Sequence, residues 1–140
     1  MTTPHIRLTD PLPKELEPGI YWLHSSLARS AIVAGLAQDD WATSVVELDG
    51  AVDKPGIMDA FARGLDFPGW VGRNWDALDD ALRDLSWWLP AERGRLVLVR
   101  GAGPVGPAVP RERRILQDVL ETAVARWATT DSPLVVLLQA

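Results

Sequence analysis

The chain has 140 residues, no cysteine and two histidines, His5 and His24. The absence of cysteine excludes disulfides, thiolate metal ligands and a cysteine nucleophile. Neither histidine has a carboxylate at ligand spacing, so the sequence does not favour a metal site or a histidine general base. We therefore expect no catalytic residue, no metal and no cofactor, in a chain whose length suits one domain.

Long apolar stretches are also missing, and so is an excess of positive charge. The longest apolar run, residues 31–37, is far shorter than the ~18 residues that a membrane-spanning helix needs. The amino terminus has no apolar segment behind a basic start, so we expect a cytoplasmic protein without a membrane partner. With 14 basic and 19 acidic residues the net charge is −5, whereas nucleic-acid binders normally carry the opposite sign. We expect no nucleic-acid partner.

A glycine pattern, G-x-G-x-x-G, occurs at residues 101–106 after an apolar run. In a dinucleotide site a helix begins directly after these glycines and binds the pyrophosphate. Here Pro104, Pro107 and Pro110 delay the next helix to about Arg111. The pattern therefore indicates a Gly/Pro loop. The basic run at residues 111–114 indicates a solvated helix face, since it is short and the chain is acidic.

The apolar spacing predicts an α/β domain. Four proline residues in the first 19 indicate an extended arm, and Ser25 or Ser26 could cap the first helix. A further helix is capped by Asn74 and closed by residues 87–90. Alternating strands and helices favour a parallel sheet of four strands packed with helices. Strands are predicted over residues 20–24, 44–48, 95–100 and 133–138, and the other helices over residues 27–38, 53–66 and 111–128.

Predicted inward faces follow from the same spacing. They comprise, in the first helix, Leu27, Ala31, Ala34 and Leu36 or Ala37; in the helix after Asn74, Trp75, Leu78, Leu82 and Leu85; and in the last helix, Ile115, Val119, Leu120, Ala123 and Trp127.

The negative charge gathers in residues 74–84 (NWDALDDALRD), which hold four aspartates and one arginine. On a helix, Asp76 and Asp80 are like-charged neighbours that cost stability, and Asp79 with Arg83 offsets this. Three interpretations stay open: metal-binding or catalytic carboxylates, a solvated helix face, or a negative surface for a positively charged partner. Trp70 would supply an apolar anchor for such a partner.

Residues 67–85, FPGWVGRNWDALDDALRDL, resemble the signature of the barstar family. An aromatic turn precedes G-x-N-x-D-A-L, and a second aspartate follows four positions after the first. The resemblance covers residues 44–140 and leaves residues 1–43 as an arm plus an added βα unit on the same domain. The matching positions are Gly72, Asn74, Asp76, Ala77, Leu78, Asp80 and Leu82.

The resemblance implies a barstar-like fold and a non-enzymatic inhibitor or immunity protein. Its partner would be a basic extracellular-type or toxin ribonuclease of the guanyl-specific, barnase-like kind, bound 1:1, with the acidic helix blocking the active site. Val71, Arg73 and Asp79 depart from the family pattern. The alternative is a non-inhibitory interaction or regulatory module that binds another basic protein; a hydrolase is disfavoured. The implied partner-binding residues are Trp70, Val71, Gly72, Asn74, Asp76, Asp79 and Asp80, with Glu121 on the last helix.

Overall fold

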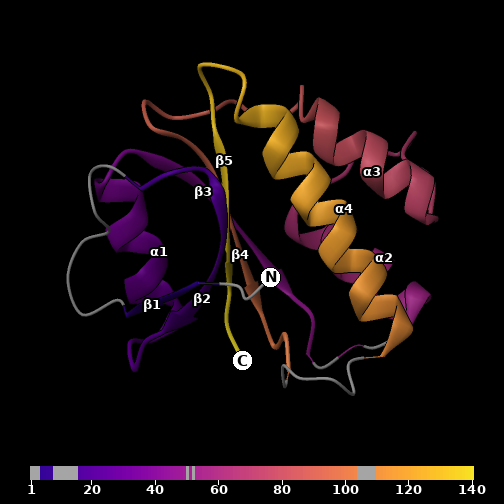
Figure 1. Cartoon of the computed structure of the whole chain (residues 1–140), viewed down its shortest axis with the longest axis horizontal. Coiled ribbons are helices and arrows are strands. Elements are labelled where there is room, and N and C mark those ends of the chain that lie inside the picture. The colour runs from indigo at the N-terminus through magenta and orange to yellow at the C-terminus, as the bar shows by residue number, and fades with distance from the viewer. Residues whose placement is uncertain (1–3, 8–15, 50, 52, 104–109) are drawn as a thin grey trace.

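Helices and strands alternate along the chain in a computed structural model, which describes residues 4–7, 16–49, 51, 53–103 and 110–140 (Figure 1). The elements run in the order β1 (His5–Arg7), β2 (Gly19–His24), α1 (Arg29–Gln38), β3 (Trp41–Glu47), α2 (Lys54–Gly64), α3 (Trp75–Asp84), β4 (Gly94–Arg100), α4 (Arg111–Trp127) and β5 (Leu134–Leu138).

The strands form one parallel sheet in the order β1-β2-β5-β4-β3. The connection from β2 to β3 crosses the sheet in one direction, while those from β3 to β4 and from β4 to β5 cross it in the other. Since crossovers between parallel strands are right-handed, these two directions place helices on opposite faces. Accordingly α1 covers one face and α2, α3 and α4 cover the other (Figure 1).

The predicted α/β class and parallel sheet are confirmed. Four strands were expected, and the described part of the chain contains a fifth, β1, within the arm that was predicted to be extended. Strand β1 pairs with β2, and the Trp22 amide adds a hydrogen bond to the Pro4 carbonyl at 2.7 Å. A three-residue strand is too short to show an alternating pattern, which is why the sequence did not indicate it.

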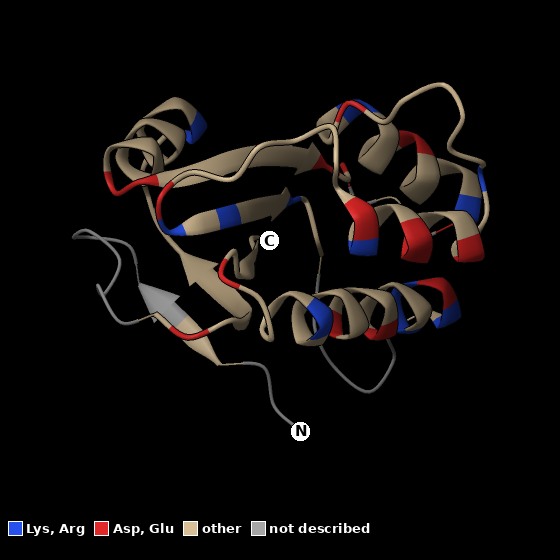
Figure 2. Ribbon diagram, turned by 90° about the horizontal axis from the view of Figure 1, so that it is seen from above, with Lys and Arg blue, Asp and Glu red and all other residues tan. Residues whose placement is uncertain are grey.

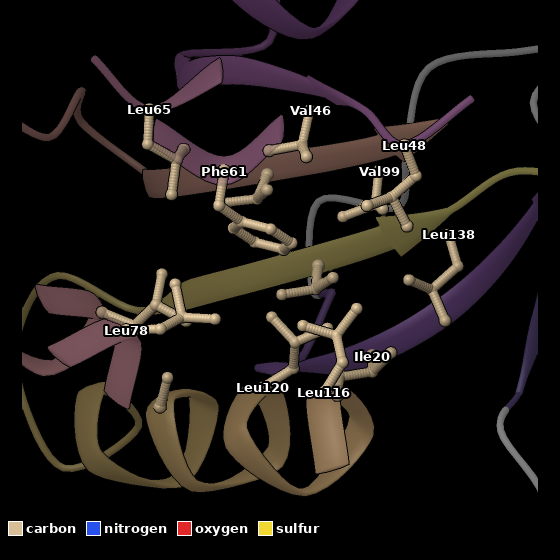
Figure 3. Packing of buried hydrophobic residues seen from close by; sticks show 14 of the residues in the cluster. Ile20, Val46, Leu48, Phe61, Leu65, Leu78, Val99, Leu116, Leu120 and Leu138 are labelled. Atoms are coloured by element: carbon tan, nitrogen blue, oxygen red, sulfur yellow. The ribbon is translucent and has the colours of Figure 1, made fainter. Parts of the chain in front are cut away.

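Two hydrophobic cores fill the spaces on the two faces of the sheet. The larger lies under α2, α3 and α4, with Phe61, Leu78 and Leu120 almost fully buried (Figure 3). The smaller lies under α1 and includes Ile32 and Leu36. Alternate residues of β5 enter one core or the other, so all five are buried. The prediction that this strand is buried on both faces is confirmed.

Helix α1 differs from its prediction at its start and in its buried face. Its N-cap is Ala28, with no side-chain cap among the described residues, so the predicted capping by Ser25 or Ser26 is wrong. The buried residues are Ile32 and Leu36. The spacing of the alanines suggested another face, but the larger side chains take the core because they bury more apolar area. The predicted inward residues Leu27, Ala31 and Ala34 are exposed, whereas of the two alternatives Leu36 and Ala37 the first is buried.

Smaller corrections concern β3 and α4. Strand β3 begins at Trp41, three residues before its predicted start, because Trp41 pairs with Gly94 at the start of β4. In α4 the predicted Leu120 and Ala123 are buried, whereas Ile115, Val119 and Trp127 are only partly so. Leu116 and Val124 complete the buried face, since α4 packs against both the sheet and α3. None of the described helices is long and apolar enough to cross a membrane.

Candidate protein interface on helix α3

Helix α3 begins and ends at residues with distinct backbone roles. The Asn74 side-chain oxygen accepts a hydrogen bond from the Ala77 amide at 2.8 Å, which confirms the predicted N-cap. Asp76 lies in the first turn, where the helix dipole favours a carboxylate. At the other end, Leu85 adopts a left-handed conformation with φ of 48° and stops the helix.

The orientation of α3 is fixed by its apolar face and by two indole hydrogen bonds. Leu78, Leu82 and Leu85 are buried, as predicted, and Trp75 is half-buried. The Trp75 indole donates to the Glu112 carboxylate at 3.0 Å, and the Trp127 indole donates to the Leu82 carbonyl at 2.7 Å. These contacts join α3 to α4 and leave the aspartates on the outer side.

A buried arginine on β4 supports the end of α3. Arg95 is 6% exposed, and its guanidinium donates to the carbonyls of Trp88 at 2.7 Å and Leu85 at 3.3 Å. It also lies 4.6 Å from the ring centre of Trp127, a cation–π contact. Burial lowers the pKa of Arg95 below its usual value. The sequence does not indicate this role for Arg95, because a charged residue at the start of a strand usually faces solvent.

An aromatic turn precedes α3. Trp70 is 69% exposed, and its ring lies edge-on against Trp87 with centroids 6.0 Å apart. Trp87 also packs edge-on against Phe67 at 5.6 Å, and its indole donates to the Leu65 carbonyl at 2.9 Å. Trp70 thus presents an exposed ring whose position is fixed by its packing against Trp87.

Three neighbours shape the rest of this turn. Val71 is partly buried, and its amide donates to the Pro68 carbonyl at 3.1 Å. Gly72 is exposed, and a Cβ there would lie 3.4 Å from that of Ala77. Arg73 forms an exposed ion pair with Asp59 of α2 at 2.7 Å. The positive charge of Arg73 is therefore paired with α2 and is not directed at the α3 aspartates.

The outer side of α3 carries the acidic face, defined as Asp76, Asp79, Asp80 and Asp84. Figure 2 shows acidic positions recurring along this helix. Asp76 and Asp80 are exposed and Asp79 is half-buried. Arg83 pairs with Asp79 at 2.8 Å, as predicted, and also with Asp80 at 2.9 Å. Arg83 thus offsets one of the four negative charges, and the net charge of the acidic face with Arg83 is negative.

Glu121 is separated from this face. It is exposed on α4, accepts a hydrogen bond from Gln117 at 3.1 Å, and lines a shallow groove with Gly19 and Tyr21 of β2. The flank of α4 that contacts α3 carries Glu112 instead. The structure therefore brings together the predicted residues of the turn and α3, but not Glu121.

The basic run at the start of α4 is less exposed than predicted. Arg113 is partly buried and donates to the carbonyls of Ala51 at 2.7 Å, Ala102 and Gly101. Burial lowers the pKa of Arg113 below its usual value. Arg113 therefore links α4 to the segments that follow β3 and β4. Only Arg111 and Arg114 of the basic run are exposed, as a solvated face requires.

The described residues contain no group of three or more histidine, aspartate or glutamate side chains arranged to hold a metal ion. The two histidines lie on β1 and β2, where the His5 Nδ1 and His24 Nε2 atoms are 2.6 Å apart and the rings stack. The aromatic turn and α3 together expose an aromatic ring and negative charge.

The part of the chain that contains the aromatic turn and α3 matches a known protein family. The family model for Barstar (barnase inhibitor) matches residues 41–139. The chain belongs to the Barstar family. The comparison with curated proteins finds no match. The Barstar match begins at the first residue of β3 and includes the aromatic turn, α3 and α4, whereas β1, β2 and α1 lie outside it. The resemblance drawn from residues 67–85 is thus confirmed.

Proposed function

We propose that this chain is a non-enzymatic inhibitor of a basic, guanyl-specific ribonuclease of the barnase type. The observation that carries the proposal is the acidic face of α3 beside the exposed, supported Trp70, in a member of the Barstar family. We place the complex in the cytoplasm with 1:1 stoichiometry, where the protein would act as an immunity protein.

Electrostatics explains why an acidic helix suits this task. A ribonuclease active site is cationic because it binds phosphates, and a negative surface accelerates association with it and improves specificity. Asp76 and Asp80 would occupy the region where substrate phosphates bind. Burying these carboxylates is costly unless each meets a cation of the enzyme, which makes the fit selective.

The remaining predicted residues would have supporting roles. Trp70 would enter an apolar pocket of the enzyme, as aromatic residues at interface centres do, with Val71 and Gly72 shaping its surroundings. Asn74 holds the start of α3 through its cap. Glu121 would reach only an enzyme that extends over the β2 side of α4.

Substitution of Asp80 tests the proposal. Asp80→Ala should weaken inhibition at least several-fold, because the enzyme would lose a paired carboxylate. Asp131→Ala is the matched control, since Asp131 is an exposed aspartate between α4 and β5. RNA cleavage by a barnase-type ribonuclease is measured as the protein is titrated to a 1:1 ratio. Equal inhibition by the two variants would show that the proposed surface is wrong.

A second candidate is a regulatory module that binds a different basic protein without inhibiting a ribonuclease. It is favoured by two elements outside the family match. Strand β2 extends the sheet beside β5, and α1 covers the face of the sheet opposite α2, α3 and α4. Cleavage that continues unchanged at a 1:1 ratio, together with saturable binding of another basic protein, would support this candidate.

A further inference from the structure

Arg83 contacts the two carboxylates that stand side by side on α3. One nitrogen of its guanidinium, Nη2, is 2.8 Å from Asp79 and 2.9 Å from Asp80. The Asp80 side chain is 78% exposed, that of Asp79 is 29% exposed, and that of Arg83 is 42% exposed. The more exposed of these two carboxylates, Asp80, is therefore already paired within its own helix.

This pairing contributes little to holding α3 in place. Exposed ion pairs three or four residues apart add little to helix stability. The cap at Asn74, the buried leucines and the Arg95 contacts already fix the helix. The larger effect of Arg83 is on the charge that a partner meets, because it neutralises Asp80 where binding would use it.

We propose that Arg83 competes with the partner for Asp80 and so sets the selectivity of the acidic face, an inference that rests on the proposed function. Arg83 holds one oxygen of Asp80, Oδ1, so a cation of the enzyme that is to bind both oxygens must displace it. An arginine that binds both oxygens of a carboxylate does this better than a single lysine ammonium. The competition therefore favours an enzyme that presents an arginine to Asp80.

Asp79 lowers the free-energy cost of displacing Arg83 from Asp80. When Asp80 turns to the enzyme, Arg83 keeps its 2.8 Å contact with Asp79, so its charge is not left unpaired in the interface. Loss of Asp79 would remove that alternative partner and leave Arg83 with Asp80 alone. Substitutions at Arg83 and Asp79 should therefore change binding in opposite directions.

The experiment measures association rate and affinity for a barnase-type ribonuclease at low and high salt. Arg83→Gln should strengthen binding about two- to fivefold, which corresponds to the loss of an exposed ion pair. Asp79→Asn should weaken binding by a similar factor of about two to five. The double variant should behave like Arg83→Gln. At about 1 M salt these differences should shrink, because the Debye length falls from about 10 Å at 0.1 M to about 3 Å and the attraction between exposed charges weakens.

Arg29→Gln is the control for net charge. It removes the same charge from α1 on the opposite face of the sheet, where Arg29 pairs with Glu47 at 3.4 Å. Its effect on binding should be smaller than that of Arg83→Gln, and an equal effect would overturn the competition. Circular dichroism of each variant checks that the helices are intact.

The outcomes separate this inference from the proposed function. If the wild-type protein binds and Arg83→Gln binds no better, the competition is overturned and the proposed function stands. If Arg83→Gln binds and the wild type does not, the competition is supported and inhibition by the natural chain is overturned. If neither binds, both are overturned.

Discussion

The two faces of the sheet are covered in different ways. On one face α1 is a single helix with no side-chain cap among the described residues and no acidic residue on its exposed side. On the other, three helices carry two side-chain caps, from Asp53 and Asn74, and the acidic face. Both faces bury a core against the same strands. Apolar burial is thus common to both faces, whereas the acidic face and the exposed Trp70 lie on the side that α2, α3 and α4 cover.

The largest effect is expected from a cavity in the core under α2, α3 and α4, on the side of the sheet that carries the acidic face. Phe61 is fully buried in the larger core, so Phe61→Ala should lower the free energy of unfolding by about 3–5 kcal/mol. Urea denaturation measures the change. Leu89→Ala is the control, since Leu89 is 81% exposed and its loss should change stability by no more than about 0.5 kcal/mol. Similar losses in both variants would contradict the assigned core.

A cavity on the α1 side should separate stability from binding. Ile32 is 1% exposed, and Ile32→Ala should lower the free energy of unfolding by about 2–5 kcal/mol. Under conditions where this variant stays folded, its affinity for a ribonuclease should equal that of the wild type. A calorimetric titration of folded Ile32→Ala measures that affinity, and a weakened complex would mean that the two faces are coupled.

The smallest test compares the two helix starts. Asn74→Ala removes the cap of α3 and should cost about 0.5–2 kcal/mol. Ala28→Ser gives α1 a cap at a position whose backbone is already extended, and should add about 0.5–1 kcal/mol. Thermal unfolding of both variants measures the shifts. A gain at Ala28 no larger than that of Ala31→Ser, inside the helix, would argue against the cap.

Much of the fold and of the site could be read from local patterns. Asn74 caps α3 as predicted, and Asp53 caps α2 at the start of the helix predicted over residues 53–66, because an N-cap depends on one side chain and the next turn. The pair of Arg83 with Asp79 follows from helical spacing alone. The signature at residues 67–85 then identified the family.

Contacts between distant segments could not be read in this way. Arg95 supports α3 through carbonyls seven and ten residues earlier, and Trp75 meets Glu112 across 37 residues. The separation of Glu121 from α3 depends on how α4 rotates about its axis, which the packing of β2 and the sheet decides. Sequence spacing defines a helical face but not what lies opposite it.

Strand β2 has a further consequence, because it covers β5. Every residue of β5 is apolar and buried, and its backbone pairs with β4 on one side and β2 on the other. A chain shortened to residues 41–139 would keep the whole family match but leave the β5 edge unpaired. Open apolar edges recruit strands from other molecules. Strand β2 would thus protect β5 from pairing with other molecules. Light scattering of the shortened chain, compared with that of the full chain, would show whether it aggregates more.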